Sequence, residues 1–151
     1  MTTLRRLDAW TEQFFRVADA MSEMATCPRA SMGAVIVSKS RRILATGFNG
    51  SPSGASHCDP SGCIMVDGHC RRAVHAEANA IIQVARYGGY LDGLEPTIYI
   101  TSSPCPICAG LIAQAGIREV VYRDVYSELE ISTKVLAQAG VSLWRWAPIG
   151  Q

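Results

Sequence analysis

The sequence predicts an α/β domain in which helices cover the faces of a mixed β-sheet. Two observations support this fold class. The sequence has short apolar runs typical of strands and longer segments that have helical periodicity or end at a glycine, and after the first hairpin these two kinds of segment alternate. The chain has 151 residues, of which 48% are hydrophobic, enough for one core. No repeat, low-complexity segment or linker divides the sequence. We therefore expect a single domain over residues 1–151.

The first half of the chain predicts one helix and a hairpin. Residues 4–25 form an amphipathic helix, whose apolar stripe consists of Leu7, Trp10, Phe14, Val17, Ala18 and Met21. The continuous apolar run at 33–38 indicates a buried strand. A polar turn at 39–42 leads into a second strand at 42–48.

The second half of the chain alternates helices with strands. It is preceded by residues 49–71, which lack periodicity, and a loop this long usually serves a function or is clamped. The predicted helices cover 75–87, 105–115 and 128–139, each followed by glycine, and the strands cover 97–101, 119–122 and 141–146. This alternation implies a mixed sheet whose ligand sites lie beyond the carboxyl ends of its strands.

Charge and composition narrow the classes of partner. The formal net charge is +1, which does not indicate a long polyanionic partner, and no basic stripe favours nucleic acid, so a small substrate fits at least as well. The charged, amphipathic N-terminus does not resemble a signal peptide, and no apolar run reaches the roughly 18 residues of a membrane span. We expect a cytoplasmic protein with no membrane partner. In a cytoplasmic chain, six cysteines favour metal ligation over disulfides.

Two cysteines three residues apart open a predicted helix. Cys105 and Cys108 share one face of that helix, so both sulfurs can reach one ion. The helix dipole favours their thiolates, and Pro106 fits the first turn because its missing N–H costs little there. Taken alone, the pair could equally be two buried cysteines of a core helix.

A histidine and a glutamate two residues apart open another helix. His75 and Glu77 point to different faces, which suits a metal ligand and a carboxylate that contacts water on the metal. By itself His75 could be a hydrogen-bonded core residue. Together with Cys105 and Cys108 it makes three protein ligands, which leave tetrahedral zinc an open position, as in catalytic sites. Zinc then lowers the pKa of water toward ~7, and a carboxylate can pass the proton to a leaving amine.

The combination of His75-Ala76-Glu77 with Pro104-Cys105-x-x-Cys108 is the signature of the cytidine deaminase-like zinc enzymes. Roughly residues 27–126 resemble deoxycytidylate (dCMP) deaminases of the bacterial and phage type, through CPRASMGAVIV, GFNGSPSG, HCRRAVHAEANAI and TSSPCPICA. The resemblance implies a three-layer α/β/α fold with a five-stranded mixed sheet. It also implies hydrolysis of dCMP to dUMP and ammonia, which supplies thymidylate synthesis.

The resemblance assigns roles to individual residues. It implies that His75, Cys105 and Cys108 bind the catalytic zinc and that Glu77 moves protons. The implied substrate contacts are Asn49 near the sugar, and Ala76, Ser102, Ser103 and Tyr126 around the base. For the phosphate, the candidates are Arg29, which we favour, Arg71 and Arg72, because phosphate needs cationic donors.

One position departs from the family. The usual Gly-Tyr-Asn-Gly segment has Phe48 in place of tyrosine. In the family this loop is associated with activation by dCTP and inhibition by dTTP, with magnesium accompanying the nucleotide. We expect weakened control here, since a hydroxyl is lost. The family commonly forms hexamers, so we also expect a homo-oligomer; Trp144 and Trp146 could serve its interface or the core.

Four cysteines remain outside the catalytic pair. Phage relatives carry a second, structural zinc in this region, and Cys27, Cys58, Cys63 and Cys70 could form a closed four-thiolate site. Such a site would clamp a loop that has few apolar residues. His57 or His69 could replace one cysteine, and free thiols are the alternative.

Two other functions remain open from sequence. One is a deaminase of the same fold acting on tRNA adenosine, guanine or a riboflavin precursor; the Gly-x-Asn-Gly-x-Pro-x-Gly loop and the Cys/His-rich insert favour dCMP over these. The other is a non-catalytic zinc module, against which Glu77 argues, since a structural site needs no proton-shuttling carboxylate.

Overall fold

The structure is a computed structural model that describes residues 3–58 and 62–148. Its centre is a five-stranded mixed sheet in the order β2-β1-β5-β6-β7. The strands are β1 (Gly33–Val37), β2 (Ile43–Phe48), β5 (Thr97–Ser102), β6 (Glu119–Asp124) and β7 (Ser142–Arg145). β1 runs antiparallel to β2 and β5, whereas β5, β6 and β7 are parallel. The predicted five-stranded mixed sheet is therefore confirmed.

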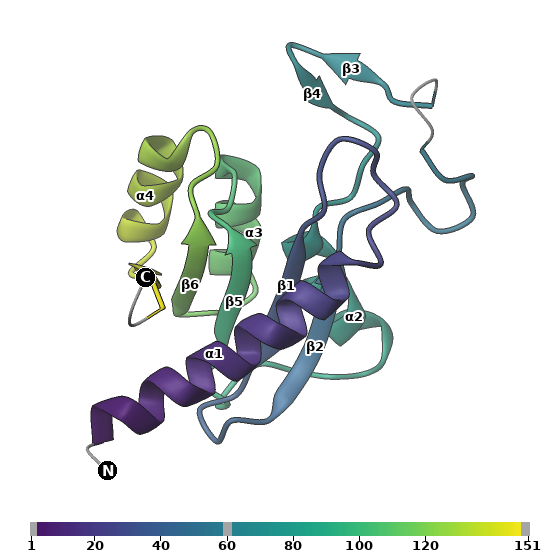
Figure 1. The fold of residues 1–151 in the computed structure, drawn as a ribbon. Coiled ribbons are helices and arrows are strands. Elements are labelled where there is room, and N and C mark those ends of the chain that lie inside the picture. The colour runs from purple at the N-terminus through teal and green to yellow at the C-terminus, as the bar shows by residue number, and fades with distance from the viewer. Residues whose placement is uncertain (1–2, 59–61, 149–151) are drawn as a thin grey trace.

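Four helices cover the two faces of the sheet, α1 on one face and α2, α3 and α4 on the other (Figure 1). They are α1 (Thr3–Ser22), α2 (Ala76–Arg86), α3 (Pro106–Gln114) and α4 (Leu129–Gln138). Strand β1 shows why the layers form. Val35 and Val37 pack with Phe14 and Ala18 of α1, while Ala34 and Ile36 face the larger core under α2 and α3. Because both faces are covered, the strand reads as a continuous apolar run.

The N-terminal helix differs from its prediction in where it ends and in one buried residue. It ends at Ser22, three residues before the expected end, and Phe15, outside the predicted stripe, is fully buried. Phe15 stacks on Trp146 at 4.7 Å between ring centroids and meets Tyr99 edge-on. Trp146 therefore packs against the helix, whereas Trp144 is exposed.

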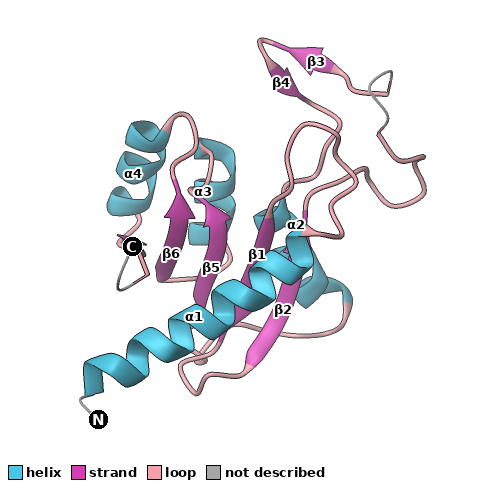
Figure 2. Cartoon of the chain, viewed as in Figure 1, coloured by secondary structure: helices cyan, strands magenta, loops and turns pink. Residues whose placement is uncertain are grey.

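The region between β2 and α2 contains a hairpin that the sequence analysis missed. Strands β3 (Met65–Val66) and β4 (His69–Cys70) pair antiparallel around Asp67 and Gly68, and the hairpin projects from the body of the molecule. Both turn residues have positive φ, 50° and 78°, as a two-residue hairpin turn requires. The rest of the described part of residues 51–73 has almost no regular structure (Figure 2). No helix in the described ranges is long and apolar enough to cross a membrane.

Candidate metal centre and active site

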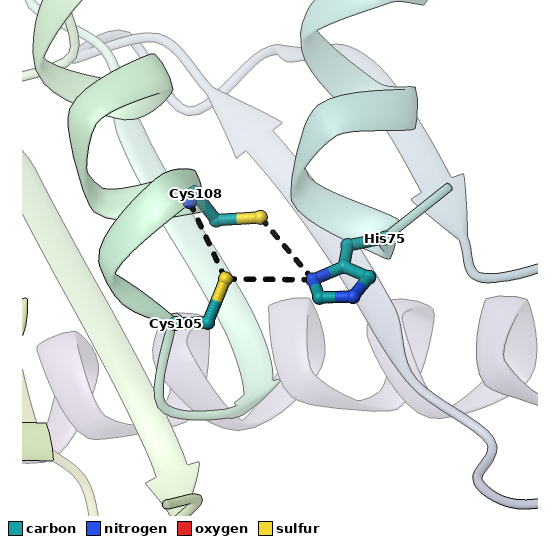
Figure 3. Close-up of side chains that lie close together, drawn as sticks. All are labelled: His75, Cys105 and Cys108. Atoms are coloured by element: carbon teal, nitrogen blue, oxygen red, sulfur yellow. Dashed lines mark hydrogen bonds between the residues drawn. The ribbon is translucent and has the colours of Figure 1, made fainter. Parts of the chain in front are cut away.

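Two helix starts bring three metal-type ligands together. His75 caps α2, and Cys105 caps α3, where its Sγ accepts a hydrogen bond from the Cys108 backbone N–H at 3.4 Å. Pro106 occupies the first turn of α3, as predicted. Both chain segments enter their helices in extended conformation, with ψ of 156° at His75 and 165° at Cys105. The caps therefore point the three side chains into the same space (Figure 3).

The spacing of the three ligand atoms fits tetrahedral zinc. His75 Nδ1 lies 3.6 Å from Cys105 Sγ and 3.5 Å from Cys108 Sγ, and the three ligand atoms all lie within 4.8 Å of one another. Zinc bonds of about 2.0–2.1 Å to nitrogen and 2.3 Å to sulfur at tetrahedral angles put such atoms about 3.5 Å apart. One nitrogen and two sulfurs are also a donor set that zinc prefers. The arrangement fits a zinc ion with one coordination position open to the cavity.

The protonation of the three ligands reflects their closeness. The pKa of Cys105 falls to about 4, because its thiolate accepts a hydrogen bond from the Cys108 thiol first and from His75 next. The pKa of Cys108 is raised for the same reason, since it holds the shared proton. The pKa of His75 is raised by its hydrogen bond to Cys105. The pair thus readily presents a thiolate, the form that binds metal.

Glu77 lies in the first turn of α2 and is only 6% exposed. Burial raises its pKa to about 7, which nearby His75 only partly offsets. It lines the same cavity as the three ligands but is not part of their group. A carboxyl group with a pKa near neutrality can both take and give a proton at pH 7.

A cavity of about 830 Å³ opens above this centre. Its lining includes the residues predicted around the sugar and base and the favoured phosphate candidate, namely Asn49, Ala76, Ser102, Ser103, Tyr126 and Arg29. Ser102 and Ser103 lie at the carboxyl end of β5, where a site was expected, and the Ser103 hydroxyl accepts from the Tyr126 N–H at 2.8 Å. Asn49 is 6% exposed, and its amide accepts from Met32 N–H and donates to the Ala30 carbonyl.

The three candidate arginines are placed differently. Arg29 and Arg71 line the cavity, but Arg72 does not. Arg72 donates to the Ser56 and Gly62 carbonyls and to Cys58 Sγ, so it holds the loop together. Arg29 lies at the cavity rim and donates to Gly68 O at 3.1 Å and to Met65 Sδ at 2.8 Å.

Cys63 interacts electrostatically with the three other cysteines outside the catalytic pair, Cys27, Cys58 and Cys70. Its pKa is raised by burial, by its hydrogen bond and charge interaction with Cys70, and by the charges of Cys58 and Cys27. Burial tends to raise the pKa of Cys70 as well, but backbone N–H groups of Ala73, Arg72 and Ile64 lower it overall. Cys58 is buried and contacts Arg72 at 3.3 Å.

One residue lining the cavity had no signal in the sequence. Glu128 caps α4 with φ of 64°, a left-handed conformation that costs a side-chain-bearing residue energy. Its carbonyl accepts from the Ser132 N–H, but its carboxylate makes no hydrogen bond or ion pair within the described part of the chain. Only the fold brings it to the cavity.

The family defined by the cytidine and deoxycytidylate deaminase zinc-binding region matches residues 8–124. The chain belongs to this family. It is 42% identical to ComE operon protein 2 of Bacillus subtilis over 135 residues, which cover 89% of this chain and 70% of that protein. It is 40% identical over 124 residues to the deoxycytidylate deaminase of Mycobacterium phage D29, covering 75% and 93% of the two chains.

A solved structure extends the similarity to the whole fold of this deaminase. The dCMP deaminase of cyanophage S-TIM5, in complex with dCMP and dUMP, superposes with a TM-score of 0.78 at 34% identity. The match covers 97% of this chain and 99% of the phage chain. The expected family and its α/β fold are both confirmed.

Proposed function

We propose that this deaminase hydrolyses dCMP to dUMP and ammonia, a step that supplies dUMP for thymidylate synthesis. The observation that carries the proposal is Glu77, a buried carboxyl group with a pKa of about 7, beside the His75/Cys105/Cys108 centre. Both line a cavity that arginines also line. The relatives named deoxycytidylate deaminase and the phage structure with dCMP and dUMP support the same substrate. A non-catalytic zinc module would have no use for a buried proton-transferring group.

In the proposed mechanism, His75, Cys105 and Cys108 hold a zinc ion, which supplies Lewis-acid activation of water. Glu77 would accept the two protons of the attacking water in turn, passing one to N3 of the ring and the other to the leaving amine. A C–O bond forms at C4 and the C4–N bond breaks, so dCMP and water give dUMP and ammonia. The Ala76 N–H at the start of α2 and the Ser102–Ser103 turn orient the base, Tyr126 lines its pocket, and Asn49 contacts the sugar.

A substrate panel tests the proposed reaction. Ammonia release is measured from dCMP, CMP, deoxycytidine and an adenosine-containing RNA, with guanine and a riboflavin precursor as further members. We expect dCMP to have the highest kcat/KM. If deoxycytidine were turned over as efficiently as dCMP, phosphate recognition would be contradicted. If another compound of the panel had the highest kcat/KM, that compound would take the place of dCMP as the proposed substrate.

We propose Arg29 as the main phosphate contact, because it is a cationic rim residue already fixed by two contacts to the hairpin. Arg29→Ala should raise KM for dCMP about 10- to 100-fold, since a charge-assisted hydrogen bond is worth about 1.5–3 kcal/mol. It should leave kcat/KM for deoxycytidine unchanged. Arg86→Ala, at an exposed position outside the cavity, is the control. If Arg71→Ala has the larger effect, the assignment moves to Arg71.

We propose a second, structural zinc at Cys27, Cys58, Cys63 and Cys70. Its support is the hydrogen bond between Cys63 and Cys70, the influence of the Cys27 and Cys58 charges on Cys63, and the N–H groups directed at Cys70, which stabilise a thiolate. Four thiolates are a closed structural donor set. Six thiols kept for metal suit the reducing cytoplasm, which we propose as the location.

We also propose residual effector control in a homo-oligomer, the hexamer being the expected size. Phe48 lines a second cavity of about 420 Å³, whereas the adjacent Asn49 lines the active-site cavity. A nucleotide that contacts this segment could therefore influence both cavities.

Rate curves with dCTP or dTTP and magnesium should show weak activation and inhibition, and Phe48→Tyr should strengthen the dCTP response. Light scattering gives the oligomer size, and curves unmoved by either nucleotide would contradict control.

A further inference from the structure

The segment from Gly47 to Gly50 contacts the first turns of α2 at one end and Val74, which lies two residues before that helix, at the other. A Cβ atom at Gly47 would lie 2.2 Å from Ala76 O and 2.6 Å from Ala80 N, so only glycine lets the helix approach this closely. At the other end, Gly50 and Val74 exchange two backbone hydrogen bonds of 3.1 and 2.8 Å. These contacts bracket the residues that carry the candidate chemistry.

Between these two contacts lies one hydrogen bond from a side chain. Asn79 Nδ2 donates to the Phe48 carbonyl at 2.7 Å. Phe48 ends β2, an edge strand of the sheet. Asn79 lies one helical turn after His75, to whose carbonyl its own N–H donates at 2.9 Å. Asparagine is a poor helix former, so its place inside α2 is better explained by this bond than by helix stability.

The residue after Phe48 extends the connection to the cavity rim. Asn49 Oδ1 accepts from the Met32 N–H at 2.8 Å, and its Nδ2 donates to the Ala30 carbonyl at 2.9 Å. Met32, Ala30 and Arg29 all line the cavity. Hydrogen bonds thus connect the helix that carries Glu77, through the adjacent residues Phe48 and Asn49, to the cavity-lining residues Ala30 and Met32.

We propose that Asn79 is a positioning residue of the deaminase. Through the Phe48 carbonyl it fixes Asn49 and the 29–32 segment relative to the start of α2, so that sugar and base are held in register. The inference rests on the proposed function for its kinetic test, but its structural content does not. Loss of the bond should weaken productive substrate binding while the metal ligands stay in place.

The kinetic test is Asn79→Asp, which keeps the shape of the side chain and removes the donor. We expect KM for dCMP to rise about tenfold, kcat to change less than threefold and zinc content to stay constant. Asn79→Ala should behave similarly. The control is Gln114→Glu, the same amide-to-carboxylate change at an exposed position on α3, and it should leave KM unchanged. A simple loss of stability would lower kcat through inactive protein and leave KM unaltered.

A second measurement does not depend on the substrate. In hydrogen exchange followed by mass spectrometry on zinc-loaded protein, Asn79→Asp should speed exchange at residues 30–32 and 48–50 and leave α2 protected. A wild type that releases no ammonia from dCMP would overturn the proposed function alone. An active wild type with KM for Asn79→Asp within twofold, or unchanged exchange at both segments, would overturn the role of Asn79.

Discussion

The two groups of cysteines are held in opposite ways. Cys105 and Cys108 belong to a helix start that packs on the sheet, and the backbone sets their spacing before any metal arrives. Cys58, Cys63 and Cys70 lie in a region whose only regular structure within the described residues is a short hairpin. The catalytic ligands are therefore positioned by the fold itself, whereas the proposed structural zinc would have to order the loop that carries its own ligands.

The largest expected effect concerns the preorganised site. Glu77→Gln should lower kcat for dCMP by about 10²–10⁴-fold, the usual contribution of general acid–base catalysis. Its catalytic zinc should remain, because Glu77 is not part of the ligand group. Activity assays combined with metal analysis check both statements. Near-normal turnover would remove Glu77 from the mechanism, and loss of zinc would make it a ligand.

The next prediction separates the two metal sites. Wild-type protein should contain two equivalents of zinc, and Cys63→Ser and Cys108→Ser should each lose one. Only Cys63→Ser should increase hydrogen exchange across the described parts of residues 51–73, because a metal clamp there replaces a core. Only Cys108→Ser should abolish turnover outright. One equivalent in the wild type, with four titratable thiols, would contradict the structural site.

The buried carboxyl group of Glu77 makes the unfolding free energy of the metal-free protein depend on pH. Glu77 has a folded pKa of about 7, above the ordinary 4.5, so its contribution to stability is fully present below about pH 4.5 and is lost as pH rises through 7. Relative to Glu77→Gln, the metal-free protein should lose about 3 kcal/mol of unfolding free energy across this range. Urea unfolding at several pH values measures this, and parallel profiles for the two proteins would contradict it.

The smallest effect compares strain in the two regions. Glu128, at the start of α4, and Asp67, in the hairpin turn, both have positive φ. Glu128→Gly should raise the unfolding free energy by about 1 kcal/mol, because glycine adopts this conformation without strain. Asp67→Gly should leave global unfolding unchanged, since the hairpin lies outside the core. An equal gain from both substitutions would show that the hairpin unfolds together with the sheet.

Much of the fold follows from local patterns in the sequence. The sequence pattern predicted β1, β2, β5, β6 and β7 to within about two residues, and most clearly β1, which is buried throughout and therefore has a continuous apolar sequence. Strands β3 and β4 have two residues each, too short for any periodicity, although Asp67-Gly68 was a usable turn signal. Phe15 was missed because one helix can bury side chains on two neighbouring stripes, here against β5 and Trp146.

The residue types of the site could be predicted from the sequence, but the hydrogen-bond partners of these residues could not. Residue types and spacing, together with the family signature, selected His75, Cys105, Cys108 and Glu77 as candidates, and the structure brings the three candidate ligands together. Nothing in the sequence shows that Nδ1 of His75 faces the sulfurs, or that Arg72 is used by loop carbonyls rather than by the cavity. Such choices depend on which partners the fold brings within hydrogen-bond distance.

The backbone pairing of Gly50 with Val74 has a consequence for how the molecule can change. The chain leaves the α/β domain after Gly50 and returns at Val74, and the two hydrogen bonds between these residues join the two ends of the loop. Everything between them is an excursion whose length is not constrained by the sheet. Between the proposed zinc ligands and cavity residues, the described parts of 51–73 can therefore change in length or sequence while α2 keeps its starting point, and new rim residues can be introduced without rebuilding the catalytic helix.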